Sequence, residues 1–364
     1  MTKTVQVQLG PRSYEIRIGA GALAQESEWI VANLKPSHVL IVADRSVVAL
    51  ADPLQRKLTA AHVRCDLSVV PSGETSKSVA ALERLWQAFQ TAGADRQSVV
   101  VAVGGGVVGD LAGFAAATYM RGLRFVQIPT TLLAQVDSSV GGKTGINLAA
   151  GKNLVGAFWQ PTSVCIDTDS LKTLPKREFV SGLAEVVKYG VIGDAALFAR
   201  LESYADALLQ RESEVLAEVI ADCCQAKATV VEQDEFEQTG LRASLNYGHT
   251  FAHAFERVYG YGQLLHGEAV AMGMACAARL AEQLGMWSND DSQRQEQLLR
   301  RLGLPVWLTP TDLDEILAAM TKDKKAAHGR LKFVLPTRLG HVELVEGIDM
   351  QRVKDVLRSA MTEG

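Results

Sequence analysis

The chain has 364 residues, of which 48% are hydrophobic and 21% charged, and 37 basic against 41 acidic residues give a net charge of −4. The length exceeds what one core usually serves, so we expect two domains, and the composition excludes a disordered or fibrous protein. The acidic balance argues against nucleic acid or an acidic membrane surface as a partner, because their binders carry a basic excess.

The N-terminal region resembles a strand and not a signal peptide. Residues 1–18 alternate apolar and polar side chains and lack a continuous apolar run. The most apolar window, Val99 to Ala117, contains Asp110 and five glycines, so a buried strand, turn and helix explains it better than a membrane span. The five cysteines are odd in number, include no CxxC pair and lie mostly in apolar runs, which together indicate reduced, buried thiols. We therefore expect a cytoplasmic protein.

The first half of the chain alternates β-branched runs with helical patterns. Buried strands are expected at residues 38–44, 67–70, 98–103, 124–129 and 163–168. Between two of them, Val79, Leu82, Leu85 and Phe89 recur at helical spacing, and Gly93 is a plausible helix stop. This alternation predicts an α/β domain over residues 1–170, with a mostly parallel sheet covered by helices on both faces.

The second half consists mainly of amphipathic stretches. They lie at residues 178–192, 195–209, 212–232, 241–259, 267–284, 291–302 and 312–321, with a short strand expected at 331–336 and another near 341–346. We therefore predict an all-α metal- and substrate-binding domain over residues 171–364. Two domains of different class predict a cleft, where small-molecule sites usually occur.

A glycine-rich turn follows the strand expected at 98–103. Gly104, Gly105, Gly106 and Gly109 have GxGxxG spacing before a helical pattern. Glycines let backbone amides approach a pyrophosphate, although a tight strand-to-helix turn also needs glycine for steric reasons alone. A Rossmann fold requires an acidic residue at the end of a strand about 20 residues later, and this sequence has none there. Asp44, however, ends an earlier expected strand. The motif alone leaves dinucleotide binding and a structural turn both open.

A polar stripe occupies one face of the helix expected over 241–259. Arg242, Asn246, His249 and His253 are spaced by four, three and four residues, which places them within an arc of about 60°. Solvated helix faces are usually built from Lys, Glu and Gln, so we favour a functional site over a wet face.

His266 begins the next expected helix, so two helices offer imidazoles to one place. A catalytic zinc site typically has three protein ligands and an open position, and the third ligand should be a carboxylate or another histidine. Glu185 is the candidate, because Glu185 and Lys188 are the only charged residues in an otherwise apolar helical stretch. The alternative is a plain i,i+3 salt bridge. The run HTFAH lacks the glutamate of HExxH, so peptide hydrolysis is not indicated.

Several cations occur in glycine-rich or polar turns or in an amphipathic helix, and together they suggest a pocket for a carboxylate and a phosphate. They are Arg121, Lys143, Lys152 (with Asn153), Lys227, Lys324 and Lys332. Any one of these lysines alone is better explained as a solvated surface residue.

These motifs together resemble the 3-dehydroquinate synthase family of the sugar phosphate cyclases. The matching runs are residues 71–77, 104–122, 128–147, 151–161, 182–190, 241–256 and 266–274. The resemblance implies an NAD-binding α/β domain followed by a helical domain, usually in a homodimer.

The resemblance also implies a set of site residues. The divalent metal, zinc or cobalt, would be held by Glu185, His249 and His266. NAD contacts would come from Asp44, Glu74, Lys77, Gly105, Gly106, Asp110, Thr130, Thr131, Asp137, Ser138, Lys152, Thr173, Leu174 and Glu178. Substrate contacts would come from Asp137, Lys143, Lys152, Asn153, Lys188, Lys227, Arg242, Asn246 and His253, with Arg121 from the partner subunit. At the C-terminal end we prefer Lys332 to Lys324.

The implied activity converts 3-deoxy-D-arabino-heptulosonate 7-phosphate into 3-dehydroquinate and phosphate, a step of the shikimate pathway. It would proceed by transient oxidation by NAD, β-elimination of phosphate, re-reduction, ring opening and an intramolecular aldol reaction. Two rival enzymes are a sibling cyclase acting on another sugar phosphate and a metal-dependent polyol dehydrogenase. The third alternative is a non-catalytic dinucleotide sensor, although a sensor has no use for the metal ligands and the motif lysines.

Overall fold

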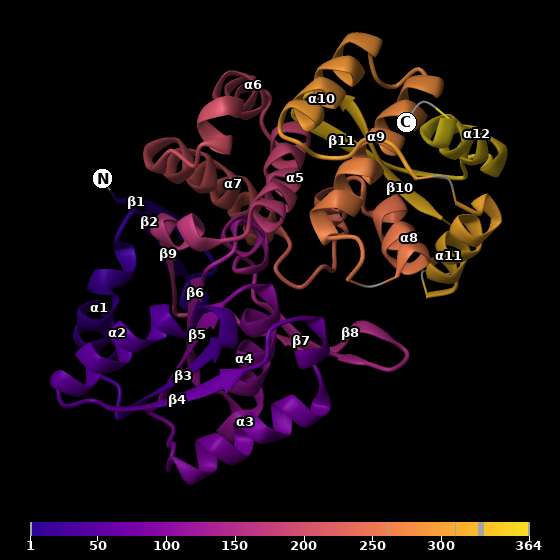
Figure 1. Cartoon of the computed structure of the whole chain (residues 1–364). Helices are drawn as coiled ribbons and strands as arrows, with labels where there is room; N and C mark the ends of the chain where they lie inside the picture. The colour runs from indigo at the N-terminus through magenta and orange to yellow at the C-terminus, as the bar shows by residue number, and fades with distance from the viewer. Residues whose placement is uncertain (1, 261, 310, 327–330, 363–364) are drawn as a thin grey trace. The chain divides into compact units, whose positions relative to one another are not determined.

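The computed structural model describes residues 2–260, 262–309, 311–326 and 331–362. Its contacts divide the chain into two compact units (Figure 1). Unit 1 comprises Met1–Pro175 and Ser213–Phe236, and unit 2 comprises Lys176–Glu212 and Glu237–Gly364. The segment Ser213–Phe236 therefore packs with the first unit, although it lies within residues 171–364, the range expected for the helical domain.

Unit 1 is built on a seven-stranded sheet with the order β1-β2-β9-β6-β5-β3-β4. The strands are β1 (Lys3–Val7), β2 (Tyr14–Gly19), β3 (His38–Asp44), β4 (Arg64–Val70), β5 (Val99–Gly104), β6 (Arg124–Pro129) and β9 (Ser163–Asp167). Only β1 and β2 pair antiparallel; the remaining ladders of this sheet are parallel. The expected mostly parallel α/β fold is confirmed.

Helices cover both faces of this sheet because its central strands are apolar on both sides. The helices of unit 1 are α1 (Glu26–Leu34), α2 (Val48–Ala60), α3 (Val79–Thr91), α4 (Gly106–Thr118) and α7 (Ser213–Gln233). In β3, Val39 and Ile41 pack in one core with α1 and α2, whereas Leu40 and Val42 pack in another with α3 and α4. Helix α7 packs against β1 and β2.

Short helical turns connect these elements. They are η1 (Gly10–Arg12), η2 (Ala22–Gln25), η3 (Arg45–Val47), η4 (Glu74–Ser76), η5 (Tyr119–Arg121), η7 (Thr168–Thr173) and the π-helical turn η6 (Ala134–Ser138). π-helical turns are rare and are frequently found at functional sites.

A hairpin occupies the segment for which the sequence indicated only glycine-rich turns. Strand β7 (Lys143–Leu148) pairs antiparallel with β8 (Gly151–Phe158), and Gly145 lies opposite Gly156. A β-carbon at Gly156 would lie 2.1 Å from the carbonyl oxygen of Thr144. The two glycines therefore serve close strand approach, which corrects the expectation of turns at Lys143 and Lys152.

Unit 2 is mainly helical, as expected. It contains α5 (Lys176–Ile192), α6 (Ala195–Leu209), η8 (Leu241–Asn246), α8 (His249–Tyr259), α9 (His266–Gln283), α10 (Asn289–Arg301), α11 (Leu313–Ala326) and α12 (Met350–Thr362). It also contains the expected terminal strands, as the antiparallel pair β10 (Lys332–Arg338) and β11 (His341–Glu346). Helix α9 is buried along most of its length and packs against α5, α8, α10, α12 and β10.

The single helix predicted over residues 241–259 is wrong. The segment forms the 3-10 turn η8, a break at Tyr247–Gly248, and then α8. Gly248 has φ = 80°, and a β-carbon there would lie 2.8 Å from the backbone nitrogen of Met274 on α9. The break arises because the backbone turns at Gly248 and packs directly on α9. Arg242 and Asn246 thus belong to a different element from His249 and His253.

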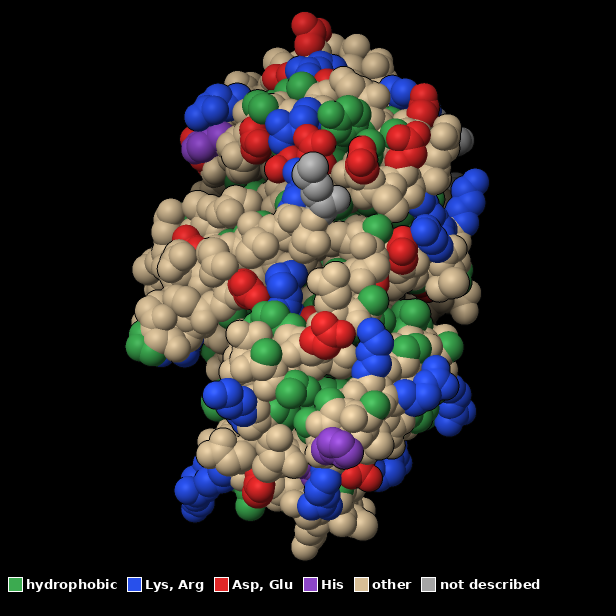
Figure 2. All heavy atoms as spheres, turned by 90° about the vertical axis from the view of Figure 1, so that its left-hand side faces the viewer, with side chains coloured by type: hydrophobic (Ala, Val, Ile, Leu, Met, Phe, Trp, Pro, Cys, Tyr) green, Lys and Arg blue, Asp and Glu red, His purple; other side chains and the backbone are tan. Residues whose placement is uncertain are grey.

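Charges of both signs are mixed on the face of the molecule drawn in Figure 2. Lys and Arg side chains are interspersed with Asp and Glu side chains over the face in Figure 2, in keeping with 37 basic and 41 acidic residues. Within the described part of the chain, the helices include none with the length and apolar character needed to cross a membrane.

Candidate functional site

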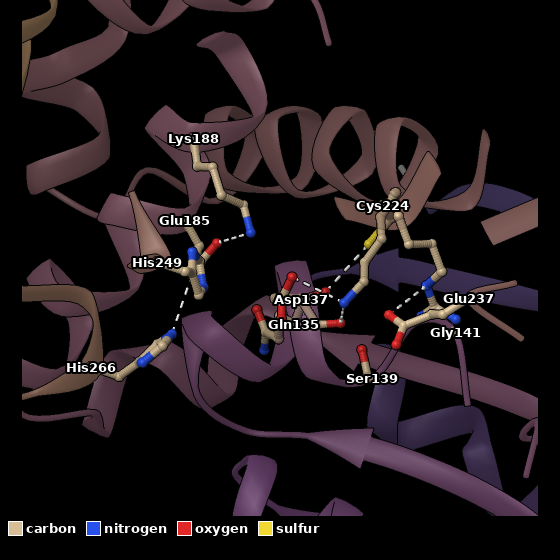
Figure 3. Close-up of polar contacts among 12 residues, drawn as sticks. Gln135, Asp137, Ser139, Gly141, Glu185, Lys188, Cys224, Glu237, His249 and His266 are labelled. Carbon is tan, nitrogen blue, oxygen red and sulfur yellow. Dashed lines mark hydrogen bonds and ion pairs between the residues drawn. The ribbon is translucent and has the colours of Figure 1, made fainter. Parts of the chain in front are cut away.

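Three side chains of unit 2 converge in the manner of a metal site. Glu185 on α5, His249 at the start of α8 and His266 at the start of α9 offer ligand atoms that all lie within 4.8 Å of one another. Nε2 of His249 and Nε2 of His266 each lie 3.4 Å from Oε1 of Glu185. Figure 3 shows these side chains around one point, with Lys188 beside Glu185. The convergence predicted from sequence for Glu185, His249 and His266 is thus present.

Two glycines permit this convergence. A β-carbon at Gly267 would lie 1.8 Å from the carbonyl oxygen of Ser181, so α9 can begin directly against α5 only with glycine beside His266. A β-carbon at Gly273 would lie 2.2 Å from the carbonyl oxygen of Gly248, which brings α9 equally close to the start of α8. The backbones of α5, α8 and α9 therefore meet where the three ligand candidates lie.

Neighbouring groups orient both imidazoles. Nδ1 of His249 lies 3.1 Å from the carbonyl oxygen of Tyr247, and because a carbonyl only accepts, Nδ1 carries the proton and Nε2 keeps its lone pair. Nδ1 of His266 lies 3.6 Å from Oε1 of Glu256. In metal-binding histidines, the ring nitrogen that does not face the metal typically contacts a carbonyl or a carboxylate in this way.

The electrostatics of the cluster keep its carboxylate ionised. Burial acts to raise the pKa of Glu185, but the Lys188 ammonium and the two histidines outweigh it and hold this pKa well below its usual range. Burial lowers the pKa of His249. For His266 burial also acts to lower the pKa, yet Glu185 and Glu256 raise it to about 10. The cluster therefore presents an anionic carboxylate and one imidazole that burial keeps neutral.

The cluster fits a tetrahedral divalent cation. Two ligand atoms that each lie about 2.1 Å from zinc in a tetrahedral site are about 3.4 Å apart, which matches both distances from Glu185 to the histidines. Both carboxylate oxygens of Glu185 are buried; Oε2 forms an ion pair with Nζ of Lys188, and Oε1 lies 3.4 Å from Nε2 of both histidines. A divalent cation there would compensate the buried carboxylate, which among the described residues also pairs with the Lys188 ammonium.

The other candidates of unit 2 differ in exposure. Arg242 is buried, with Nε 3.6 Å from Oε1 of Glu237, and Asn246 is exposed at the end of η8. His253 is exposed on α8, one turn from His249, and the two ring centroids are 5.6 Å apart. Nζ of Lys332 pairs with Oε1 of Glu346 across the β10–β11 hairpin at 2.8 Å. The side chain of Lys324 lies outside the described residues.

In unit 1, candidate cofactor residues gather around the glycine-rich turn at the carboxyl ends of β3, β5 and β6. Gly105 caps α4 and Gly106 begins it. A β-carbon at Gly105 would lie 3.2 Å from Cγ2 of Thr131, and one at Gly106 would lie 2.9 Å from Oγ of Ser138. The backbone nitrogen of Thr130 donates to the carbonyl of Gly104 at 2.9 Å. Asp44 ends β3 and accepts from the Ser46 backbone at 2.8 Å.

A second group of candidates in unit 1 surrounds a buried lysine. Nζ of Lys77 donates to Oδ2 of Asp110 at 2.6 Å and to Oδ1 of Asn153, and it lies 3.9 Å from Oε1 of Glu74. Asn153 has φ = 55°, a left-handed backbone conformation. The side chain of Asn147 joins the group by donating to Glu74 at 2.7 Å.

A third contact links η6 to α7. Nζ of Lys227 donates to the carbonyl oxygen of Asp137 at 2.7 Å and to Oδ1 of the same residue at 2.9 Å. Lys227 is buried. The lysine thus holds both the backbone and the carboxylate of one candidate cofactor residue.

The remaining candidates are spread over several elements. Lys143 is at the base of the β7–β8 hairpin and Lys152 is beside its turn. Arg121 is exposed at the end of η5 with φ = 67°. Thr173 ends η7, Leu174 follows it, and Glu178 is exposed in the first turn of α5. The roles of these residues stay predictions.

Sequence reasoning missed several residues that support these groups. Glu256 is seven residues after His249, a spacing that places both on one helix face and offered a signal. Asn147 lies within a run that matched the family but carries no charge. Gln135 and Tyr247 gave no signal, because their hydrogen bonds join segments that are distant in sequence.

The sequence comparisons decide the family. Residues 67–181 match the family described as 3-dehydroquinate synthase N-terminal, and residues 182–326 match 3-dehydroquinate synthase C-terminal. The chain is 50% identical over 359 residues to a 3-dehydroquinate synthase of Rhodopirellula baltica (strain DSM 10527 / NCIMB 13988 / SH1), covering 96% of each chain. The chain belongs to the 3-dehydroquinate synthase family.

Solved structures of sugar phosphate cyclases share the fold of this family member. A 2-epi-5-epi-valiolone synthase from Streptomyces hygroscopicus subsp. jinggangensis 5008, with NAD+ and Zn2+ bound, is 30% identical. It superposes with a TM-score of 0.87 over 95% of this chain and 96% of that chain. A 2-deoxy-scyllo-inosose synthase complexed with carbaglucose-6-phosphate, NAD+ and Co2+ is 27% identical, with a TM-score of 0.88 over 98% and 100%.

Proposed function

We propose that this chain converts 3-deoxy-D-arabino-heptulosonate 7-phosphate into 3-dehydroquinate and phosphate, as a carbon–oxygen lyase that uses NAD and one zinc or cobalt ion. The observation that carries the proposal is the convergence of Glu185, His249 and His266 in a chain of this family. The net reaction eliminates phosphate and forms a carbocycle without net oxidation or reduction.

The metal would be held by Glu185, His249 and His266. This assignment is supported by the tetrahedral spacing of their ligand atoms and by the bound Zn2+ and Co2+ of the two cyclase structures. NAD would lie over the glycine-rich turn of unit 1, where backbone amides at the start of α4 favour a pyrophosphate. Asp44, Lys77, Asp110 and Thr131 are proposed to contact it.

When bound, NAD supplies reversible hydride acceptance and the divalent cation supplies polarisation of the reacting oxygens. The protein's own side chains have to bind and orient the substrate. Arg242 carries a fixed fork of donors suited to the substrate carboxylate, and the exposed Asn246 adds an amide. The lysine side chains at 152, 188 and 227 offset the negative charge of carboxylate and phosphate.

Substrate positioning is the second task of these residues. Elimination of phosphate and closure of the ring both require one conformer of a flexible sugar acid, and fixed cationic contacts favour that conformer. The departing phosphate oxygen is proposed to accept the proton from the neighbouring carbon, so no protein base is needed for this step. His253 is proposed to contact the substrate and not the metal.

A homodimer with Arg121 reaching the partner subunit is part of the proposal. Arg121 is exposed, and Met120, Arg121 and Gly122 have φ values of 51°, 67° and 123° in succession. Strained backbone of this kind is retained where surrounding structure or function requires it. The oligomeric state can be measured directly by sedimentation.

The alternative that this chain is a sibling cyclase has a specific basis. The two cyclases with solved structures are named for products other than 3-dehydroquinate. The presence of Arg242 and Asn246, which match the carboxylate-facing positions of 3-dehydroquinate synthases, favours a substrate with a carboxylate. A polyol dehydrogenase would release NADH in proportion to substrate and would not need so many cations.

The first experiment measures phosphate release from 3-deoxy-D-arabino-heptulosonate 7-phosphate with catalytic NAD, before and after chelation. We expect rapid release that chelation abolishes and zinc or cobalt restores, without accumulation of NADH. Glucose 6-phosphate and glycerol serve as matched alternative substrates. Release from glucose 6-phosphate alone would favour a sibling cyclase, and NADH accumulating with glycerol would favour the dehydrogenase.

A further inference from the structure

The amide side chain of Gln135 ties together the carboxyl ends of two parallel strands of unit 1. Gln135 is fully buried in the π-helical turn η6. Its Nε2 donates to the carbonyl oxygen of Pro129, the last residue of β6, at 3.1 Å, and to that of Asp167, the last residue of β9, at 3.2 Å. The ladder between these strands pairs Val126 with Ser163 and Gln127 with Val164. The amide thus bridges the strands beyond their last paired residues.

A third acceptor extends this link to η7. Nε2 of Gln135 also donates to Oγ of Ser170 at 3.1 Å, while the Ser170 hydroxyl donates to the carbonyl of Asp167 at 2.7 Å. Two N–H bonds therefore share three acceptors. The reversed amide orientation would place Oε1 against two carbonyl oxygens, so the contacts fix which end is nitrogen.

Each of the three tied segments carries residues assigned here to the cofactor. Thr130 and Thr131 follow Pro129, and Asp137 and Ser138 follow Gln135 within η6. Thr173 ends the turn η7 that contains Ser170, and Leu174 follows it. The backbone of Gln135 is fixed as well, because its carbonyl accepts from Sγ of Cys224 on α7 at 3.3 Å (Figure 3). Ligands of parallel α/β sheets bind at this carboxyl edge.

We propose that Gln135 is a positioning residue for the dinucleotide: its amide holds three turns in the one arrangement that receives NAD. This inference rests on the proposed function, because it presumes that these turns bind NAD. Without the amide, two buried carbonyl oxygens lose a donor, and the turns are free to move apart to find water.

The test measures NAD binding to purified full-length variants directly, by titration calorimetry in the absence of substrate. Gln135→Met keeps the length and volume of the side chain but removes the donors. It should weaken NAD binding by at least about tenfold while metal content stays unchanged. The control is Leu58→Ala, which opens a cavity in the core between α2 and the sheet, so that it lowers the melting temperature without touching the three turns.

Equal NAD affinity in Gln135→Met and wild type would overturn the inference while leaving the proposed function intact. Wild-type protein that fails to bind NAD would overturn both. A loss of affinity in Leu58→Ala as large as that in Gln135→Met would show that general loosening, and not the amide, is responsible.

A second variant keeps the inference testable if Gln135→Met does not fold. Gln135→Glu is nearly isosteric, and its carboxyl can donate one hydrogen bond only while protonated. NAD affinity of this variant should approach that of wild type at low pH and fall as the introduced carboxyl ionises and faces two carbonyl oxygens. A pH profile parallel to that of wild type would overturn the inference.

Discussion

The two units build their candidate sites from different materials. In unit 2 the ligand atoms come from side chains on three packed helices, and close backbone contacts at Gly267 and Gly273 bring those helices together. In unit 1 the candidate cofactor residues lie on turns at the carboxyl edge of a sheet, and side chains such as Lys77, Gln135 and Lys227 hold the turns. The candidate metal site therefore depends on helix packing, whereas the candidate nucleotide-binding turns depend on hydrogen bonds from polar side chains.

The largest effect is expected from removing a metal ligand. His249→Ala should lose the metal and, with it, turnover. Loss of a hydrogen-bond partner of a metal-binding histidine lowers activity by roughly 10–100-fold, and loss of the histidine itself should lower turnover by more. Metal content is measured by plasma mass spectrometry, turnover by phosphate release, and NAD binding by calorimetry. Because the nucleotide turns belong to unit 1, binary NAD affinity should be kept.

His253→Ala is the matched control, since it removes an imidazole one helical turn away. It should keep its metal and lose turnover through poorer substrate binding. A metal-loaded, active His249→Ala protein would refute the ligand assignment. Metal loss in His253→Ala would exchange the roles of the two histidines.

A smaller effect is expected from the buried guanidinium of unit 2. Arg242→Ala should raise KM and lower kcat together, reducing kcat/KM by about 10–100-fold, because a charge-assisted contact to the substrate carboxylate is lost. The metal content should not change. Arg294→Ala removes a partly exposed guanidinium that pairs with Glu202 and serves as the control. Kinetics equal to those of wild type would remove Arg242 from the site.

The smallest effect is expected at the glycine-rich turn. Gly106→Ala places a β-carbon 2.9 Å from Oγ of Ser138, and that hydroxyl can rotate away, so the fold should be kept. NAD affinity should fall by about 2–10-fold, the value of one misplaced hydrogen bond, as measured by calorimetry.

A double-mutant cycle sharpens this prediction. If Gly106→Ala acts through Ser138, it should cost nothing further in a Ser138→Ala background. A full additional loss there would mean that the new methyl group obstructs the dinucleotide itself.

The sequence predicted most of the fold because the hydrophobic pattern is local. The strand expected at 38–44 and the helix expected at 195–209 coincide with β3 and α6. The candidate metal ligands could also be proposed from the sequence, since Glu185 is a costly charge in an apolar helix and His266 begins a new helix. In both cases the signal lies in residues near one another in the chain.

The features that escaped prediction depend on contacts that are distant in sequence. The break at Gly248 is caused by close packing on α9, and the β7–β8 hairpin depends on glycines facing each other across two strands. The amide of Gln135 has partners 32 and 35 residues away. No periodicity or propensity within one segment reports such contacts.

Unit 1 is built from two separate segments of the chain, and this division affects how it folds during synthesis. Its last strand ends at Asp167, yet α7, which packs against β1 and β2, is not complete until Gln233. During translation, α5 and α6 of the other unit are made before α7. The sheet therefore emerges from the ribosome without the helix that covers its first two strands, and a chaperone would find apolar surface there until α7 arrives.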